Sequence, residues 1–426
     1  MNGTGYFSER RLKYAATLND ESLSESTDPD LVLTYIDIGN VDSQGRIHDI
    51  VSHRFEAAPS RARRIVRNGD VIISTVRTYL QAIAAIELSP ENLIVSTGFA
   101  VVRPSRLLNN NYLKYALRSG SFLSEIEGRS IGVSYPAINP SELGSIKIHL
   151  PTLEIQPVIA DYLDCETGRI DGLIAEKDRM LALLDERRAA LISQAVTRGV
   201  NSDISLKSSS HEWLGDLPAH WEVRRLKQLA EVRGGLTLGK QYGQAALLNY
   251  PYLRVANVQD GFLDLEDVLT VDASPADATS NLLRYGDVLM NEGGDIDKLG
   301  RGCVWRDEIK PCLHQNHVFA VRPHSVQSEW LALWTSSPEA KRYFESRAKR
   351  STNLASISSW NIKELVVPIP PAAEQSAIQL QLSASLQRIE SIRKELIESV
   401  RLLRARRAAL ISAAVTGQIP LEQMQS

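Results

Sequence analysis

Apolar residues recur at alternating spacings of four and three in two long stretches of the chain. In the first stretch, eight of the eleven positions at this spacing are apolar. These positions are Ile159, Leu163, Glu166, Ile170, Ile174, Lys177, Leu181, Leu184, Arg188, Leu191 and Ala195. Such a stripe lies along one face of a helix and is typical of a coiled coil. The helix should begin within a turn of Pro157, since proline is tolerated only in the first turn.

The second stripe lies 219 residues further along the chain and keeps the register without a gap. It runs from Ile378 to Ala414, and again eight of its eleven positions are apolar. About 40 residues at 1.5 Å per residue give each helix a length of roughly 60 Å. Each stripe can be buried against the other, and the intervening chain can return between them. We therefore expect the two helices to pack antiparallel.

A nearly identical segment ends both helices. Residues 187–197 read RRAALISQAVT and residues 406–416 read RRAALISAAVT, with ten of eleven positions identical. This period is too long for a solenoid and indicates two related halves. The halves share further segments in the same order: TYIDIGNV (34–41) with PYLRVANV (251–258), GDVIIS (69–74) with GDVLMN (286–291), FAVVRP (99–104) with FAVRP (319–323), and IKIHLP (146–151) with VVPIPP (366–371).

The segments outside the two stripes alternate between strand and turn signals. Strands are predicted at 34–41, 70–74, 82–88, 98–104 and 145–151, and helices at 111–126 and 329–344. The predicted fold class is α+β: two mixed α/β domains, each followed by a long helix, with the two helices forming an antiparallel coiled coil with pseudo-two-fold symmetry. The expected boundaries are domain 1 at 1–151, helical spacer 1 at 152–198, a polar linker at 199–212, domain 2 at 213–369, helical spacer 2 at 370–417 and a tail at 418–426.

Composition narrows the class of protein. The 426 residues are 43% hydrophobic and 23% charged, which is ordinary for a soluble globular protein. No apolar run approaches the roughly 18 residues that a membrane span needs, and the N-terminus lacks a signal peptide's apolar segment. Three scattered cysteines suit a reducing compartment, so we expect the protein to be cytoplasmic. We also expect it to need no cofactor. With a net charge of −3, any surface that binds nucleic acid must be a local basic patch.

Three segments carry a resemblance to a known family. LPTLEIQ at 150–156 with the helix that follows, WLGDLPAHWEVRRLK at 213–227, and IPPAAEQ at 369–375 resemble the specificity (S) subunit of type I restriction–modification enzymes. The resemblance covers the whole chain. It implies a non-catalytic subunit with two target-recognition domains, one for each half-site of a bipartite double-stranded DNA target. It also implies two methyltransferase (modification) subunits and added restriction subunits as partners. The second helix departs from the pattern, since SASLQRIESIRKEL replaces LDCETGRIDGLIAEK.

Loops after the predicted strands are where polar side chains would reach base edges. In domain 1 the candidates for DNA contact are Arg77, Thr78 and Tyr79, and then Arg129, Ser130, Ser134 and Tyr135. In domain 2 they are Asn291, Glu292, Asp295, Lys298 and Arg301, and then Arg347, Lys349, Arg350, Thr352 and Asn353. The alternatives are an ordinary glycine-rich hairpin for the 291–302 loop and a solvated charged face for the basic stretch from 341 to 350.

Further polar residues admit two interpretations. Arg61, Arg63, Arg64 and Arg67, and also His314, Gln315 and Asn316, could face DNA. Lys177, Arg188, Arg393 and Arg407 interrupt the apolar stripes. Their stems are expected to pack while their charged ends reach solvent or glutamates, but they could instead fix the register of the helices or meet the methyltransferase.

Catalytic and metal motifs are weak. GGLTLGKQ (234–241) resembles a phosphate-binding loop, but Gln241 replaces the residue that binds magnesium. The spacing of Cys303, Cys312, His314 and His317 does not match a zinc site. We expect no metal site and no catalytic residues. The rival hypotheses are a scaffold whose domains bind protein rather than DNA, and a fused enzyme, which the missing motifs argue against.

Overall fold

The computed structural model describes residues 7–87, 90–200, 204–239, 246–351 and 354–425. They form an α+β fold in two compact units, each of which combines a globular part with halves of two long helices. Unit 1 comprises residues 1–178 and 396–426, and unit 2 comprises residues 179–395. The long helices are α4 (Ile155–Arg198) and α9 (Ala372–Val415). Pro157 therefore lies in the first turn of α4.

The globular part of unit 1 is built on two four-stranded sheets with the strand orders β2-β9-β6-β7 and β4-β3-β8-β5. The strands are β1 (Phe7–Arg11), β2 (Ala16–Leu18), β3 (Val32–Ile36), β4 (Val51–Arg54), β5 (Ala62–Ile65), β6 (Val71–Ser74), β7 (Ile83–Ala85), β8 (Leu93–Ser96), β9 (Phe99–Pro104) and β10 (Lys147–Pro151). Its short helices are α1 (Asn110–Ala116), α2 (Gly120–Arg129) and α3 (Pro140–Ser145). Strand β10 pairs with β1 and leads into α4.

The globular part of unit 2 repeats most of this arrangement, with sheets β14-β21-β17-β19 and β16-β15-β20 and the pair β13-β24; its second sheet has one strand fewer. Its strands are β11 (Leu206–Ser208), β12 (Asp216–Pro218), β13 (Glu222–Arg225), β14 (Ala230–Arg233), β15 (Leu248–Leu253), β16 (Leu269–Ala273), β17 (Val288–Asn291), β18 (Gly293–Gly294), β19 (Gly302–Val304), β20 (Leu313–His314), β21 (Val318–Pro323), β22 (Lys349–Arg350), β23 (Ala355–Ser356) and β24 (Val366–Ile369). Its helices are α5 (Pro275–Asn281), α6 (Ser328–Thr335), α7 (Pro338–Arg347) and α8 (Ser359–Lys363), and α10 (Leu421–Met424) belongs to unit 1.

Each helix that the sequence predicted at 111–126 and at 329–344 is in fact two helices. Ser337 caps α7 by accepting a hydrogen bond from the Ala340 N–H (3.2 Å), and Pro338 occupies the first turn. Proline cannot continue the preceding helix, because it lacks the N–H and clashes with the previous turn. In unit 1 the equivalent break falls at Ser119 and Gly120. The single-helix prediction was wrong because it relied on apolar spacing and ignored these breaks.

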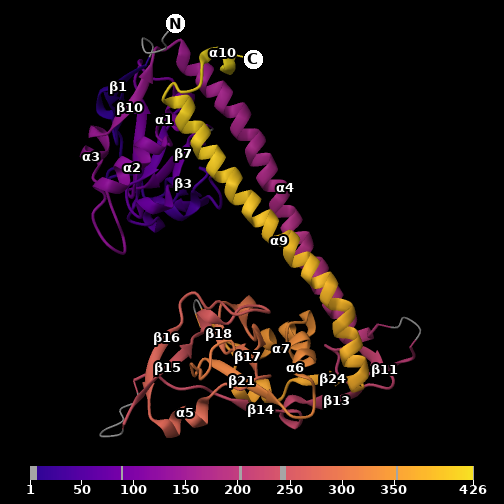
Figure 1. Cartoon of the computed structure of the whole chain (residues 1–426). Coiled ribbons are helices and arrows are strands. Elements are labelled where there is room, and N and C mark those ends of the chain that lie inside the picture. The colour runs from indigo at the N-terminus through magenta and orange to yellow at the C-terminus, as the bar shows by residue number, and fades with distance from the viewer. Residues whose placement is uncertain (1–6, 88–89, 201–203, 240–245, 352–353, 426) are drawn as a thin grey trace. The chain divides into compact units, whose positions relative to one another are not determined.

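The packing of α4 and α9 confirms the antiparallel prediction. In unit 1, Ile170 and Ile174 of α4 bury themselves against Val400 of α9. The start of α4 shares a core with the end of α9, and in unit 2 the end of α4 shares a core with the start of α9. Within each unit the two helices run side by side in Figure 1.

Arginines in the seam are paired with aspartates rather than with glutamates or solvent. The Arg407 guanidinium donates to both carboxylate oxygens of Asp171 on α4, at 2.9 and 3.2 Å. In unit 2, Arg393 lies 3.3 Å from Asp185. The Arg407 and Asp171 side chains are only 16% and 23% exposed, so their pairing ties α9 to α4 at a defined register.

The duplicated segment at the end of each long helix packs on the globular part other than the one that leads directly into that helix. Three residues of the first copy enter the core of unit 2: Ile192, Ala195 and Val196. The equivalent residues of the second copy enter the core of unit 1: Ile411, Ala414 and Val415. The serines of the two copies also meet matching elements, since Ser193 donates to Glu339 in α7 (2.7 Å) and Ser412 accepts from the first N–H of α2 (2.9 Å). Similar surroundings account for the identity of the two copies.

A buried glutamine fixes the start of each long helix. The Gln156 side-chain amide donates to the carbonyl oxygens of Pro151 (2.9 Å) and Leu107 (3.0 Å). In unit 2 the Gln375 amide donates to the Pro370 carbonyl at 2.8 Å. Both side chains are buried, and both belong to the LEIQ and AAEQ segments noted in the sequence. They join the last strand of each globular part to the helix that follows.

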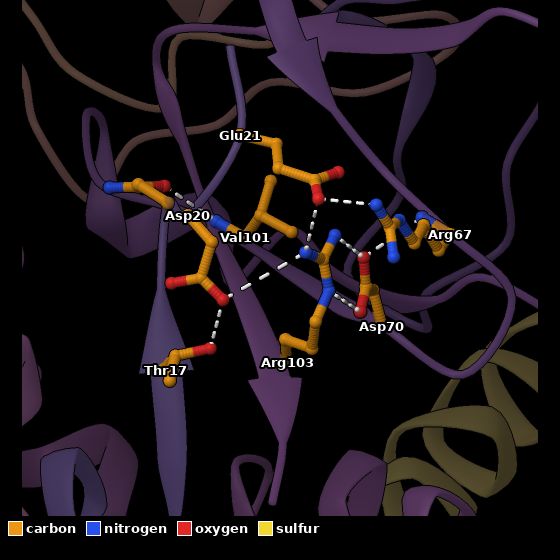
Figure 2. Close-up of polar contacts among 8 residues, drawn as sticks. Thr17, Asp20, Glu21, Arg67, Asp70, Val101 and Arg103 are labelled. Atoms are coloured by element: carbon orange, nitrogen blue, oxygen red, sulfur yellow. Dashed lines mark hydrogen bonds and ion pairs between the residues drawn. The ribbon is translucent and has the colours of Figure 1, made fainter.

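A buried aspartate–arginine pair explains two further repeated motifs. Asp70 of GDVIIS accepts from the guanidinium of Arg103 in FAVVRP at 3.0 and 2.9 Å, and from the backbone N–H of Arg67 at 2.8 Å (Figure 2). The hydrogen bond with Asp70 is the main cause that raises the pKa of Arg103. In unit 2, Asp287 pairs with Arg322 at 2.8 and 2.7 Å. Each pair joins the loop before one central strand to the adjacent central strand.

We predict that Asp287→Asn lowers the free energy of unfolding of unit 2 by about 3 kcal/mol, because it leaves a half-buried guanidinium without its carboxylate. All six tryptophans lie between positions 213 and 360, so urea unfolding followed by tryptophan fluorescence reports on this unit. The control is Asp267→Asn, which removes an 80% exposed carboxylate from its pair with Arg254. That change should cost less than about 1 kcal/mol, and equal losses for both variants would contradict the prediction.

Candidate nucleic-acid interface

Two loops of unit 1 that are distant in sequence form one surface. We call residues 75–82 and 130–137 loop pair 1. The first loop follows β6 and the second connects α2 to α3. Backbone bridges join Val76 and Ile131 to Ala137, and the hydroxyls of Thr78 and Ser130 are hydrogen-bonded at 2.9 Å. The structure thus brings the predicted 74–81 and 128–136 candidates together.

Loop pair 1 separates supporting residues from exposed ones. Thr78 is buried, so its hydroxyl holds the two loops together and does not reach the surface. Ser134, Tyr79 and Tyr135 are exposed. The exposed Arg77 places its guanidinium over the Tyr135 ring, 5.0 Å from the ring centroid, which favours a fixed orientation for this cation.

Arg129 and Arg77 differ in their electrostatic surroundings. The Arg129 guanidinium donates to Glu125 at 2.9 and 2.6 Å and to the Ser145 hydroxyl at 2.8 Å. Its charge is therefore largely compensated. Arg77 has no carboxylate partner among the residues that the structure describes, which makes it the cation of loop pair 1 that is available to an anion.

Unit 2 has an equivalent surface, which we call loop pair 2, formed by residues 292–301 and 348–357. Strand β18 in the first loop pairs with β23 in the second, and β22 extends this small sheet. Arg347, at the end of α7, and Lys349 and Arg350, in β22, are exposed, and none has a carboxylate partner within the described part of the chain. Thr352 and Asn353 lie outside the described residues. Loop pair 2 therefore carries two positive charges that no described carboxylate compensates, and Arg347 adds a third beside it.

The 291–302 candidates do not act as one group. Asn291 is buried and donates to the Val258 carbonyl at 3.0 Å, which makes it a support for the loop. Glu292 lies 2.7 Å from the His317 ring, and Asp295 pairs with Lys298. Lys298 and Arg301 line a cavity of about 620 Å³ beside the unit 2 half of α4.

The prediction that His314 could face DNA was wrong. Its side chain is buried, and its Nδ1 lies 2.7 Å from the Val318 carbonyl oxygen. Burial lowers the pKa of His314 to about 4, so the ring is neutral near neutral pH and Nδ1 is the donor. Burial also raises the pKa of the Cys303 and Cys312 thiols to about 12, so both thiols are uncharged near neutral pH.

The arginine run of unit 1 contributes to local packing. The Arg63 guanidinium stacks over Phe55, 4.7 Å from the ring centroid, and Arg67 pairs with Glu21. Arg64 is half-buried, and desolvation lowers its pKa. These contacts offer less free positive charge than the residues around loop pair 2.

The sequence interpretation did not include the apolar apex of loop pair 1. Val133 is fully exposed and Ile131 is 76% exposed. The sequence signal is the apolar triplet IGV in an otherwise polar loop, which the polar chemistry of hydrogen bonds to base edges does not single out. The apex is thus an additional candidate for recognition.

The long helices carry exposed apolar residues away from their seam. In unit 1 these are Leu173, Ile397 and Leu402, and in unit 2 they are Met180, Leu183 and Leu380. Leu183 and Leu402 are equivalent positions of the repeat, 219 residues apart. Exposed apolar side chains on a helix surface are suited to contact with a partner protein. Within the described residues, no helix has both the length and the apolar character required to cross a membrane.

A family model described as the type I restriction modification DNA specificity domain matches residues 56–171 and 218–401 of the chain. The EcoKI specificity subunit from Escherichia coli K12 is 23% identical over 329 residues, which cover 75% of this chain and 68% of that protein. The MjaVIII specificity subunit from Methanocaldococcus jannaschii is 25% identical over 320 residues, covering 72% and 71%. Both relatives are described as subunits of type I restriction enzymes.

The fold also matches a solved structure. A chain from a study of complex assembly and conformational transition in a type I R-M system superposes with a TM-score of 0.69 at 22% identity. The match covers 97% of this chain and 99% of that one. The two-unit α+β architecture is therefore shared over nearly the full length.

We predict that His314 makes unit 2 less stable in acid. Its folded-state pKa of about 4 lies below the ordinary value of 6.5, so the unfolded chain takes up the proton first. The contribution to stability is present above pH 6.5 and is lost by about 3 kcal/mol as the pH falls toward 4. Urea unfolding followed by tryptophan fluorescence at both pH values checks this.

His314→Asn keeps a donor for the Val318 carbonyl but cannot titrate, so the difference between the two pH values should shrink by that amount. His324→Asn changes an exposed histidine and serves as the control, with the wild-type pH dependence retained. A wild-type dependence that persists in His314→Asn would refute the assignment.

Proposed function

Because this chain belongs to the type I restriction modification DNA specificity family, we propose that it reads a bipartite double-stranded DNA target. One globular part reads each half-site, and the chain carries two methyltransferase subunits, to which restriction subunits are added. The observation that supports this most directly is the repeated architecture, with an equivalent four-stranded sheet in both units and different side chains in the loop pairs. Two similar readers with diverged loops suit two unlike half-sites.

Loop pairs 1 and 2 are the proposed DNA contacts. In loop pair 1 the exposed candidates are Arg77, Tyr79, Ser134 and Tyr135. In loop pair 2 they are Lys349 and Arg350, with Arg347 beside them. Thr352 and Asn353, which lie outside the described residues, remain predictions from the sequence. Phosphate contact is the expected role of the three cations, since phosphates position a protein on DNA and base edges specify the sequence. Thr78, Ser130 and Asn291 act as supports for the loops.

The remaining candidates have weaker support. Arg129, Glu292 and Asp295 are engaged in pairs with other side chains, and Lys298 and Arg301 line the cavity beside α4. Contact between these five residues and DNA would need those pairs to rearrange or DNA to reach that cavity. We therefore place them outside the primary reading surface.

The methyltransferase subunits are proposed to dock on the long helices. Each unit exposes three apolar helical residues, and two of them, Leu183 and Leu402, are equivalent through the repeat. Equivalent exposed positions support two copies of the same partner, each burying one set. In this proposal the chain supplies recognition, and its partners supply methylation and cleavage.

The test is DNA protection by the purified chain together with its methyltransferase partner. On selected DNA, the complex should protect two short segments separated by an unprotected gap. The double variant Lys349→Gln with Arg350→Gln should bind about tenfold more weakly and lower the salt slope by about 2, since each lost phosphate contact contributes roughly 0.9. Lys207→Gln removes an exposed charge from β11 and should leave both values unchanged.

Failure to select any sequence from random DNA would refute the proposal. If the complex then captured a protein through its loop pairs, the scaffold hypothesis would replace it. An unchanged salt slope in the double variant would instead remove Lys349 and Arg350 from the contact surface.

We further predict that the long helices set the gap between the half-sites. Inserting one designed heptad between Asp178 and Arg179, and one between Glu395 and Leu396, keeps the stripes in register. Seven residues add roughly 10 Å to a helix, or about 3 base pairs of DNA, so the recognised gap should lengthen.

The matched control replaces residues 172–178 and 389–395 with the same designed heptads and adds no length. Selection of the bound sequence from random DNA reads the gap directly. An unchanged gap in the lengthened variant, with specific binding retained, would rule out the helices as the determinant.

A further inference from the structure

The apex of loop pair 1 presents apolar side chains that the domain holds outward. The Ile131 N–H donates to the Ala137 carbonyl at 2.9 Å, and the Ala137 N–H donates back to Ile131 at 3.0 Å. This bridge closes the loop at its base and leaves Val133 fully exposed at its tip. Single exposed apolar residues are common, but two in one closed loop, beside an exposed tyrosine, indicate a contact surface.

The adjoining loop is held in a strained backbone conformation. Arg77 and Gln81 both have left-handed φ values, 51° and 50°, on either side of the 3-10 turn Thr78–Leu80. Non-glycine residues in this region cost free energy, and such residues concentrate at binding sites. The hydrogen bond between the Thr78 and Ser130 hydroxyls links this strained loop to the loop that carries the apex.

Charge favours DNA over protein as the occupant of the apex. Arg77 is exposed beside the apex, uncompensated by a described carboxylate, and fixed over the Tyr135 ring. An apolar tip flanked by an oriented cation fits a groove whose floor offers methyl groups and whose rim carries phosphates. The tip also stands on the loops rather than on the long helices, where the methyltransferase is proposed to dock.

The two loop pairs differ in chemistry. Loop pair 2 is flanked by Arg347, Lys349 and Arg350, and its most exposed apolar residue is Leu354. Loop pair 1 has three exposed aliphatic side chains, Leu80, Ile131 and Val133, and one available cation. The two half-sites would accordingly be read by different combinations of apolar and ionic contact.

Resting on the function proposed above, we propose that Ile131 and Val133 read the C5-methyl groups of thymines in the major groove of one half-site. Arg77, oriented by Tyr135, contacts the neighbouring phosphate. Apolar contact with this methyl group is one of the features that distinguishes a thymine from the other bases in the major groove. The half-site read by unit 1 therefore contains at least one A·T pair that is recognised through its methyl group.

The test replaces each thymine of the selected target by uracil, one at a time, which removes only the methyl group. At one or more thymines of a single half-site, the wild-type complex should bind about fourfold more weakly, the loss expected for one buried methyl group. For Val133→Ser or Ile131→Ser, the thymine target should bind more weakly and the same replacement should change affinity less than about 1.5-fold, because the methyl group's partner is already gone.

Val51→Ser is the control, since it changes another exposed valine of unit 1, in β4. It should keep the full response to uracil, and thermal unfolding should show that all variants are folded. A complex that selects its target but responds to no uracil replacement, or responds equally with Val133→Ser and Ile131→Ser, would overturn this inference and leave the proposed function standing. Absence of any selected target would refute the proposed function itself.

A further outcome would also overturn the inference: in the absence of DNA, the Val133→Ser variant no longer binds the methyltransferase, while its DNA affinity still responds to uracil as in the wild type. That result would assign the apex to the protein partner.

Discussion

The structure depends on the way each long helix ends in the core of the other unit: α4 starts in unit 1 and ends in unit 2, and α9 starts in unit 2 and ends in unit 1. We call this the exchange of helix ends. The first copy of the duplicated segment buries Ile192, Ala195 and Val196 in unit 2, and the second copy buries the equivalent residues in unit 1. Each hydrophobic core is therefore completed by both long helices. Within either unit, a change that weakens the packing of α4 on α9 removes apolar contacts from the core of that unit, so the spacer is part of the fold of each unit.

Within each unit, a few buried polar contacts keep the frame constant while the loops vary. Asp70 with Arg103, and Asp287 with Arg322, join central strands, and the buried glutamines anchor the long helices. Such groups tolerate little substitution, because removal of one partner leaves the other buried without a hydrogen bond. The loop pairs have no comparable constraint at their exposed positions, and there the two halves diverge.

The sequence predicted the features that follow from periodicity and repetition. The sequence predicts the register of both stripes, because apolar spacing dictates which face of each helix is buried. It predicts the antiparallel packing because the chain between the helices can return, and it shows that the two halves share their segments in the same order. Periodicity could not show that Ser337 and Pro338 divide a helix, since the apolar pattern continues across them.

Loop side chains were harder to predict, because a residue's type does not determine its burial. Asn291 and Thr78 have the chemistry of base contacts, but both support the loops from within. His314 is likewise buried, in β20 at the edge of a three-stranded sheet. Val133 shows the opposite case, an aliphatic residue that a polar search overlooks. Lys349 and Arg350 remain predicted contacts; the sequence shows the run of cations at 341–350, and the structure adds that both side chains are exposed.

The exchange of helix ends also imposes an order on synthesis. The residues of α9 that complete the unit 1 core, Ile411 to Val415, are made last, although the rest of that core is made first. At 5–20 residues per second, the ribosome needs roughly 10 to 40 s between the end of α4 and the end of α9. During that interval α4 carries an unpaired apolar stripe. Unit 2 can close as soon as Ile378 and Leu382 appear, so the second half of this chain can be completed before the first.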